Sequence, residues 1–214
     1  MKTKLFLLPF SVITLLIFSA ISTRATVVTF DDLHETGSGS YLVNSYQGLV
    51  WSNVAVYNTI LSPSVFGTNG CYYGMVSASN AAVNGIGNPA EIDSSTNFNF
   101  LSVYLTGAYN SNLNVEVQGF SGATLLYDTT IVASATSPTL FNFGYLGINR
   151  LYLSNSGGQP AFGTPSAPQF VMDNFTFEFV PEPSSLLLAA AGALLLCPLL
   201  KRKRAGASCE ALTP

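Results

Sequence analysis

Two segments without charged residues, one near each end of the chain, decide which part of this sequence can fold as a domain in water. The first runs from Leu5 to Ala20 and the second from Leu186 to Leu200. Such segments are targeting signals or membrane anchors and do not belong to a soluble core. We therefore expect a single folded outer domain, and we divide the chain into residues 1–25, 26–180, 181–204 and 205–214.

The first segment has the three parts of a secretory signal peptide. Lys2 and Lys4 form a basic start, the apolar stretch follows, and small and polar residues come next. An uncleaved anchor helix is the alternative, but Pro9 interrupts the apolar stretch, which is shorter than the ~20 residues that a spanning helix needs. The sequence therefore predicts that residues 1–25 are removed. The tripeptides that fit a cleavage site are Thr23-Arg24-Ala25 and Ala20-Ile21-Ser22.

The flanks of the second segment predict a membrane anchor. Prolines before it would end a strand and keep the chain extended, and basic residues after it would stay on the cytoplasmic side. The 17 residues from Ser184 to Leu200 span roughly 25 Å as a helix, and snorkelling basic side chains extend this toward a ~30 Å hydrocarbon core. We predict a transmembrane helix followed by a cytoplasmic tail, residues 205–214. The flanking residues are Pro181, Glu182 and Pro183 on one side and Lys201, Arg202, Lys203 and Arg204 on the other.

The order of these parts resembles the PEP-CTERM sorting signal of Gram-negative bacteria. The resemblance rests on Pro181-Glu182-Pro183, the short Leu/Ala/Gly-rich segment and the basic cluster, about 25 residues of the chain. It implies that an exosortase, an integral-membrane cysteine protease, recognises the motif in the inner membrane and removes the anchor. The protein would then reach the cell surface or an exopolysaccharide-rich exterior. A plain single-pass stalk is the alternative, and the ten residues after Arg204 depart from the usual pattern.

The charge of the middle region excludes one class of partner. Residues 26–180 contain nine acidic residues and one basic residue, Arg150, so their formal charge is −8. Neutralising phosphates requires several Lys or Arg side chains on one surface. We therefore expect no nucleic-acid partner.

Cysteine usage shows that the outer domain must be held together by its core. Cys71 is the only cysteine between residues 26 and 180, so no disulfide can form within this region. A domain of this size buries enough surface to fold without covalent links. We interpret Cys71 as a small buried hydrophobic residue, with a reactive or intermolecular thiol as the alternative.

The middle region has the pattern of an all-β protein. Short runs of β-branched and aromatic residues alternate with clusters of Gly, Asn, Ser and Pro. The clearest alternations put Leu113, Val115 and Val117 on one face of a strand, and Phe175 and Phe177 on one face of another. The predicted strands are Val27–Phe30, Leu49–Tyr57, Tyr72–Ser77, Phe98–Thr106, Leu113–Phe120, Thr124–Val132, Thr139–Phe143, Arg150–Ser154 and Gln169–Phe179.

These strands predict an antiparallel β-sandwich, with a jelly roll as the first choice. In that fold the first and last strands are neighbours. Phe30-Asp31-Asp32-Leu33 and the segment from Phe170 to Phe175 resemble the corresponding strands of outer domains in PEP-CTERM proteins and of carbohydrate-binding jelly rolls. Residues 157–168, rich in Gly, Pro, Ser and Ala, are predicted to form a long loop before the last strand.

The sequence offers little for catalysis. The chain has a single histidine, His34, which we interpret as a solvated loop residue, and no lysine between Lys4 and Lys201. Zinc is disfavoured for the same reason. A carboxylate pair for glycoside hydrolysis is the enzymatic alternative. Its candidates are Glu91, Asp93, Glu116, Asp128 and Glu178.

Calcium suits the acidic residues better, because its ligands are hard oxygen atoms. Asp31 and Asp32 would meet Asp173 if the terminal strands are adjacent. Many crowded carboxylates repel one another, and a divalent cation would relieve this. We therefore predict a structural calcium site at these three residues, with ordinary solvated or capping acids as the alternative.

Aromatic residues make sugar binding a hypothesis, with ordinary core aromatics of a β-sandwich as the alternative. All ten tyrosines and the only tryptophan lie in the outer domain, and aromatic rings serve sugars as flat platforms. Two functions remain: a non-catalytic surface or matrix protein that binds exopolysaccharide, and a secreted glycan-active enzyme. The candidate platforms are Trp51, Tyr72, Tyr73 and Tyr109.

Overall fold

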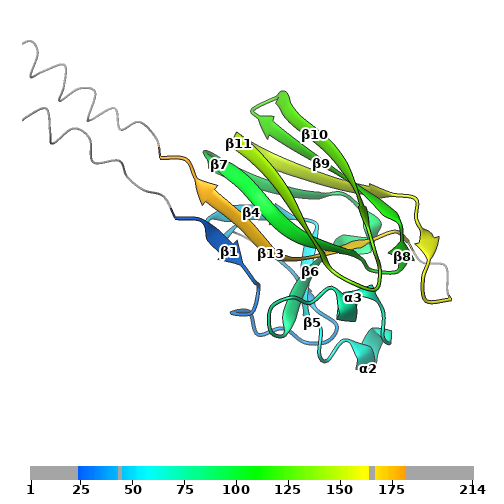
Figure 1. Ribbon diagram of the computed structural model, residues 1–214. Coiled ribbons are helices and arrows are strands. Elements are labelled where there is room, and N and C mark those ends of the chain that lie inside the picture. The colour runs from blue at the N-terminus through cyan, green and yellow to red at the C-terminus, as the bar shows by residue number, and fades with distance from the viewer. Residues whose placement is uncertain (1–23, 43–44, 164–166, 182–214) are drawn as a thin grey trace, which may run out of the picture. The chain divides into compact units, whose positions relative to one another are not determined.

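The structure is a computed structural model that describes residues 24–42, 45–163 and 167–181 (Figure 1). Ser22–Val180 form one compact unit. Most of the predicted signal peptide and most of the predicted sorting segment lie outside the described residues. Within the ranges that are described, no helix combines the length and the hydropathy needed to cross a membrane.

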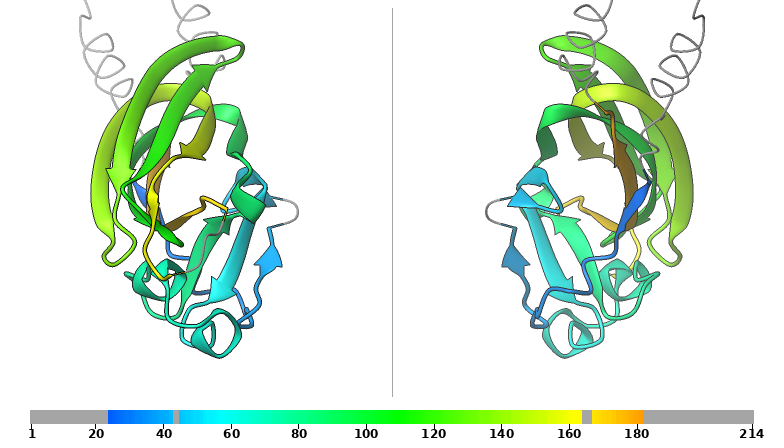
Figure 2. Two further views of the ribbon diagram at one scale, coloured as in Figure 1. Left: turned by 90° about the vertical axis from the view of Figure 1, so that its right-hand side faces the viewer. Right: turned by 90° about the vertical axis from the view of Figure 1, so that its left-hand side faces the viewer.

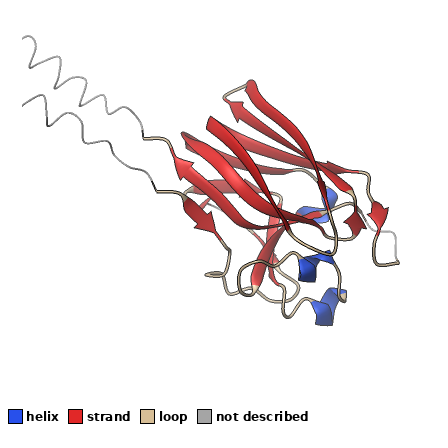
Figure 3. Cartoon of the chain, viewed as in Figure 1, coloured by secondary structure: helices blue, strands red, loops and turns tan. Residues whose placement is uncertain are grey.

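The outer domain is built almost entirely of antiparallel strands, and its helices are single short turns (Figure 3). The all-β prediction is confirmed. The strands are β1 (Thr26–Val28), β2 (Ser40–Tyr41), β3 (Ser45–Tyr46), β4 (Leu49–Ser52), β5 (Val54–Asn58), β6 (Asn80–Asn84), β7 (Ala90–Gly107), β8 (Asn110–Ser111), β9 (Leu113–Ser121), β10 (Thr124–Ala133), β11 (Thr139–Ser156), β12 (Gln159–Pro160) and β13 (Phe170–Phe179). The helical turns are α2 (Pro63–Phe66), α3 (Gly70–Tyr73) and the 3-10 turn η2 (Gly85–Gly87).

The strands with the clearest alternation agree best with the sequence. On β9, Leu113, Val115 and Val117 are fully buried, as predicted. On β13, Phe175 and Phe177 are buried as well. Each of these strands covers the core with one face, because successive side chains of a strand point to opposite sides of the sheet.

Two strand predictions are wrong for local reasons. The predicted strand Tyr72–Ser77 begins instead with α3, because the side chain of Asn69 accepts a hydrogen bond from Cys71 N and caps a helical turn. The predicted strand Leu49–Tyr57 is divided into β4 and β5 at Asn53, whose φ of 56° turns the chain. Strand β6 was not predicted, because alanine and asparagine have low β propensity.

The hydrogen-bonded sheet follows the order β10-β9-β11-β7-β13-β6-β5-β2. Strand β1 pairs with β13, with Val28 opposite Phe175, so the predicted contact between the first and last strands is confirmed. Strand β4 pairs with β3 and with β7, on the edge of β7 that faces away from β11. Strands β8 and β12 form a separate small ribbon.

Strands β7 and β11 form a long ribbon that belongs to two parts of the sheet. Near Ile92, β7 lies between β4 and β11, whereas from Phe98 onward it lies between β13 and β11. The register of β11 shifts three times between Asn142 and Arg150, and Gly144 and Gly147 have positive φ there. Such bulges bend a strand, so the sheet folds over its main core.

That core takes buried side chains from nearly every long strand. Figure 2 shows the two parts of the sheet around it from opposite directions. Because the core and the sheet lie within Ser22–Val180, we expect this unit to fold by itself. The core's largest fully buried side chains are Phe30, Phe98, Phe100, Phe170, Phe175, Phe177, Leu49, Ile92, Leu105, Leu113, Ile148 and Leu151.

Candidate functional site

Polar and aromatic side chains gather on the outward face of strands β7, β9, β10 and β11, which we call the outer sheet face. On β11, Leu151 and Leu153 point into the core, so Arg150 and Tyr152, which alternate with them, point outward. Cross-strand pairing brings side chains from all four strands into neighbouring rows. The outer sheet face consists of Glu91, Asp93, Glu116, Gln118, Phe120, Asp128, Arg150, Tyr152 and Ser154.

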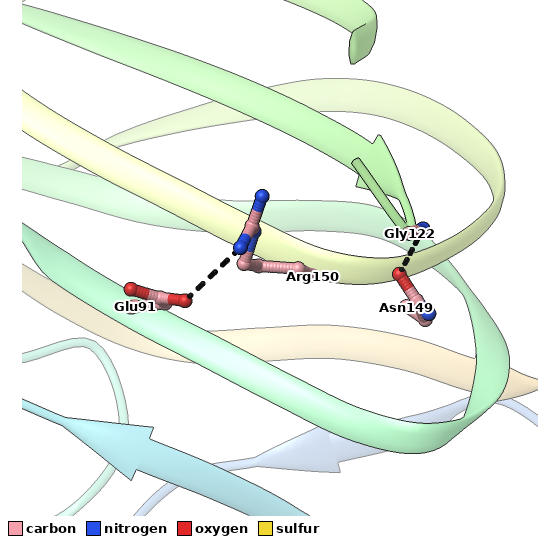
Figure 4. A network of polar contacts seen from close by, with 4 residues as sticks. All are labelled: Glu91, Gly122, Asn149 and Arg150. Carbon is pink, nitrogen blue, oxygen red and sulfur yellow. Dashed lines mark hydrogen bonds and ion pairs between the residues drawn. The ribbon is translucent and has the colours of Figure 1, made fainter. Parts of the chain in front are cut away.

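Arg150 lies at the centre of this face. Its guanidinium group forms an ion pair with Glu91, 3.7 Å between Nη1 and Oε1 (Figure 4), and lies 4.6 Å from the ring centre of Phe120. The neighbouring Asn149 accepts a hydrogen bond from Gly122 N and so ties the β9–β10 turn to β11 (Figure 4). The guanidinium is thus held in place on the sheet, and it carries five N–H donors, more than these contacts use.

A second set of contacts orders the part of the face on β9 and β10. Gln118 Nε2 lies 3.1 Å from an oxygen of Asp128 and 3.5 Å from one of Glu116. Ser154 Oγ donates to Glu116 at 2.9 Å. These side chains hold one another in fixed positions before any ligand arrives, which lowers the entropy cost of binding.

A hollow of about 330 Å³ lies on this face. Its aromatic members are Tyr152 and Phe120, which are both half-buried. Among the described residues, no hydrogen-bond partner is found for the Tyr152 hydroxyl, which leaves it for a ligand. The lining residues are Glu91, Gln118, Phe120, Arg150 and Tyr152.

Glu91, one of the residues that line the hollow, has a raised pKa. Burial raises the pKa of Glu91, and repulsion by the neighbouring Asp93 raises it further, whereas Arg150 lowers it. A perturbed carboxyl in a hollow is one mark of a functional site. A raised pKa is also what a general acid would need, and such an acid works together with a second carboxylate.

The acidic residues proposed for catalysis are largely brought together. Four of them lie on the outer sheet face, whereas Glu178 lies on β13 and accepts a hydrogen bond from Asn99. Hydrolysis of a glycosidic bond requires two carboxyl groups flanking the bond. Among the residues that line the hollow, Glu91 is the sole carboxylate. Asp93 lies beside it on β7 and raises its pKa.

Asp173 has a role within the fold. This fully buried carboxylate accepts hydrogen bonds from Val76 N at 2.7 Å and Ser77 N at 2.8 Å through Oδ2, and from Asn174 N at 2.7 Å through Oδ1. Ser77 Oγ adds a further bond at 3.0 Å. Burial raises the pKa of Asp173, and these hydrogen bonds work against that shift. Asp173 thereby fastens the loop before β6 to the last strand.

The other two predicted calcium ligands also have partners of their own. Asp31 accepts a hydrogen bond from Asn80 N at 2.9 Å, and Asp32 accepts one from the Tyr46 hydroxyl. Burial, followed by the Asp32 carboxylate, raises the pKa of Tyr46. Within the described part of the chain, no group of three or more His, Cys, Asp or Glu side chains is arranged to hold a metal ion. Calcium binding by Asp31, Asp32 and Asp173 stays a prediction.

A melting experiment can decide the calcium prediction. If Asp31, Asp32 and Asp173 hold calcium, millimolar calcium should raise the melting temperature relative to EDTA, because a ligand of the folded state stabilises it by about 2.7 kcal/mol at a hundredfold excess over Kd. Asp173→Ala should remove this difference. Equal melting temperatures of the wild-type domain in both buffers would rule the site out.

The aromatic side chains proposed as sugar platforms lie in different surroundings. Trp51 is buried, packs against Phe175 and donates its indole N–H to Tyr46 O at 3.0 Å, so it belongs to the core. Tyr72 and Tyr73 are exposed on α3. The sequence did not reveal the outer sheet face. Alternation places Phe120 on β9 and Tyr152 on β11 outside, but it does not show that the two strands pair.

Cys71 is buried, as interpreted from the sequence. Its thiol lies beside Tyr57 and Tyr109, and burial raises its pKa to about 11. Only about one thousandth of such a thiol is the reactive thiolate at pH 8. We expect a maleimide or disulfide reagent to leave the native domain unlabelled and to label it fully in denaturant. Rapid labelling of the native protein, measured by mass, would restore the reactive-thiol alternative.

His34 is exposed in the loop that follows β1, as predicted. Toward the C-terminus, Pro181 is the last residue that the structure describes. Glu182, Pro183 and the basic cluster Lys201–Arg204 lie outside the described residues.

Comparison with known families identifies one segment. Residues 179–204 match the PEP-CTERM protein-sorting motif. This confirms the resemblance found in the sequence and indicates an exported protein that is transiently anchored in a membrane. No curated protein matches the chain.

Comparison with solved structures finds distant similarities. The carbohydrate-binding module TmCBM61, solved with β-1,4-galactotriose, has 8% identity and a TM-score of 0.34, and the match covers 64% of this chain and 91% of that one. A family 29 carbohydrate-binding module from Piromyces equi has 11% identity and a TM-score of 0.36, with 75% and 93% covered. A DUF4465 family protein from Bacteroides ovatus has 11% identity and a TM-score of 0.43, with 73% and 99% covered. With scores this low, we rest no argument about the ligand on them.

Proposed function

We propose that this chain is a surface or extracellular-matrix protein that an exosortase sorts, and that its outer domain binds a neutral polysaccharide on the outer sheet face without catalysis. In this proposal residues 1–25 are a signal peptide and residues 184–200 a transmembrane helix in the inner membrane of a Gram-negative bacterium. The sheet that folds over the core is a jelly-roll sandwich.

The position of the motif supports the sorting part of the proposal. Strand β13 ends at Phe179, Val180 N donates to Asn97 O at 2.9 Å, and the compact unit ends at Val180. The match to the sorting motif begins at residue 179. The prolines therefore come directly after the fold, where a protease can reach them without unfolding the domain.

One observation carries the binding part: the hollow combines two aromatic rings with fixed hydrogen-bonding groups. Tyr152 and Phe120 offer flat apolar surfaces. Beside them Arg150 offers N–H donors, and Gln118, whose Nε2 already donates to Asp128 and Glu116, offers its Oε1 as an acceptor. Sugar rings have apolar faces and many hydroxyl groups, so this combination fits them. The face carries four carboxylates and one guanidinium. This charge disfavours an acidic polysaccharide and favours a neutral one.

Calorimetry with defined oligosaccharides tests this proposal. The domain, residues 22–180, would be titrated with cellohexaose, β-1,4-mannohexaose and β-1,4-galactohexaose, and with an oligogalacturonate of the same length as the charged control. We expect at least one neutral hexaose to bind and the oligogalacturonate to bind more weakly or not at all. Binding of none of the three neutral sugars, or preference for the charged one, would contradict the proposal.

The raised pKa of Glu91 beside Asp93 is the observation that favours the enzymatic alternative, a secreted glycan-active enzyme. The same titrations distinguish the two functions. An enzyme would release new reducing ends from the hexaose over time, whereas a binding protein would leave the hexaose intact.

A further inference from the structure

A second hollow lies on a different outer face of the domain, and we call it the tyrosine pocket. On β5, Val54 and Val56 point into the main core, so Ala55 and Tyr57 point to the opposite side, where Tyr57 is buried in a second, smaller cluster with Cys71. The pocket forms over this outward side of β5 and β6, and its volume is about 290 Å³. It is lined by Ser38, Gly39, Ser40, Tyr41, Ala55, Tyr57, Cys71, Val83, Gly85, Ile86, Tyr109 and Gln169.

The walls of the tyrosine pocket are fixed by close contacts. The Tyr57 hydroxyl donates to Cys71 O at 3.2 Å. The ring of Tyr41 lies against Gly85, where an added Cβ would stand 2.4 Å from the Tyr41 hydroxyl oxygen. A side chain at residue 85 would therefore push Tyr41 away. Glycine at this position lets the tyrosine form one wall of the pocket.

The rim of the pocket carries a backbone that is strained for its residue type. Ile86 has a φ of 53°, and its side chain is 77% exposed. A β-branched residue in this region is unfavourable, and such strain gathers at ligand sites. An exposed apolar side chain in a strained turn contributes nothing to the core. Ile86 is therefore available to contact a ligand at the mouth of the pocket.

The chemistry of the lining selects an uncharged ligand. Among the lining residues there is no Asp, Glu, Lys, Arg or His. Burial raises the pKa values of Tyr57, Cys71 and Tyr109, so these groups stay neutral as well. A charged ligand would lose its hydration without gaining a counter-charge.

Hydrogen-bonding groups remain available inside the pocket. Gln169 Nε2 donates to Asn84 O at 2.8 Å, which leaves its Oε1 as an acceptor. For the Tyr41 hydroxyl, the described residues provide no partner. Ser38 and Ser40 complete the polar part of the lining. The Ser40 hydroxyl donates to Glu35 at 2.6 Å and the Ser38 hydroxyl bonds to Thr36 at 3.0 Å, so both oxygens keep acceptor capacity.

From this arrangement we propose that the tyrosine pocket binds one neutral sugar ring, at a chain end or a side branch of a polysaccharide. Tyrosine walls match the apolar faces of a sugar ring, and the neutral polar groups match its hydroxyls. The volume lies at the small end of ligand pockets, roughly 300–1,000 Å³, which favours a single ring over a long chain segment.

The pocket and the outer sheet face lie on different outer faces of one core. Figure 2 shows β5 and β6 on the other side of the molecule from β9 and β10. One protein can therefore hold two glycan chains and cross-link them. This cross-linking rests on the proposed function of the outer sheet face, whereas sugar binding by the pocket does not.

The test is a titration of the domain, followed by backbone amide NMR shifts, with the methyl β-glycosides of glucose, galactose and mannose at millimolar concentrations. We expect one glycoside to shift the amides around Tyr41, Gly85 and Tyr109. Tyr41→Ala should weaken this binding about tenfold or more, and Tyr41→Phe, which removes only the hydroxyl, should weaken it less. Tyr72→Ala, an exposed tyrosine outside the lining, is the matched control and should change nothing.

Each outcome of this test has a defined meaning. If no glycoside shifts the pocket amides, or if Tyr41→Ala folds normally and binds as well as the wild type, the pocket proposal is wrong.

Cross-linking has its own measurement, the light scattering of a long neutral polysaccharide mixed with the domain. Tyr41→Ala should abolish the scattering increase while binding through Tyr152 persists. Pocket binding without any binding at Tyr152 would refute the outer sheet face alone.

Discussion

Replacing Asp173 with alanine should destabilise the outer domain by about 2–4 kcal/mol, because it leaves the backbone N–H groups of Val76 and Ser77 without an acceptor. For a domain of this length, that loss lowers the melting temperature by roughly 5–15 °C. The measurement is a thermal melt, with denaturant unfolding to obtain the free energy. The same substitution should also loosen the contact between the loop before β6 and β13.

Two further variants give this prediction its controls. Asp173→Asn keeps one acceptor oxygen and should cost less than Asp173→Ala. Glu178→Ala removes a carboxylate from the same strand, but one that is half-buried and accepts a hydrogen bond only from the Asn99 side chain, so it should have little effect. If Asp173→Ala melts like the wild type, the buried carboxylate does not fasten the loop to the last strand.

Replacing Pro181, Glu182 and Pro183 with alanine should reduce release of the protein to near background while leaving the outer domain folded. In the proposed function an exosortase reads this motif, and the compact unit ends before it, at Val180. The measurement combines cell fractionation of an exosortase-containing host with mass spectrometry of the released wild-type protein. That protein should lack both residues 1–25 and residues 186–200.

A neighbouring substitution separates recognition of the motif from any change near the membrane. Ser184→Ala with Ser185→Ala alters polar residues just beyond the prolines and should leave release unchanged. Normal release of the triple-alanine variant would show that the motif is not read. A wild-type protein that keeps residues 186–200 after release would show that the anchor is not cut.

The sequence predicted the fold class and the strands whose two faces differ most. Leu113, Val115 and Val117 alternate with polar residues, so only one register buries them. Strand β6 and the continuous path of β11 could not be predicted. Their positions depend on tertiary pairing, and Gly144 and Gly147 permit bulges inside a strand where the sequence suggests a turn.

The candidate sites were harder to predict because they depend on pairing between distant strands. Alternation showed that Glu116 and Gln118 face outward, but the pairing of β9 with β11 is what places Gln118 opposite Tyr152. The tyrosine pocket had no sequence signal beyond Tyr109 itself. Its wall depends on the contact between Tyr41 and Gly85, which are far apart along the chain.

The affinity of the domain for a neutral hexaose, measured by calorimetry on matched variants, tests the central claim most directly. Tyr152 lies in the hollow of the outer sheet face, whereas Tyr72 is exposed on α3. Tyr152→Ala should raise Kd at least about tenfold, a loss of ~1.4 kcal/mol, with an unchanged melting temperature. Tyr72→Ala should leave Kd unchanged. Equal Kd values for the wild type and Tyr152→Ala would show that the outer sheet face does not bind the polysaccharide.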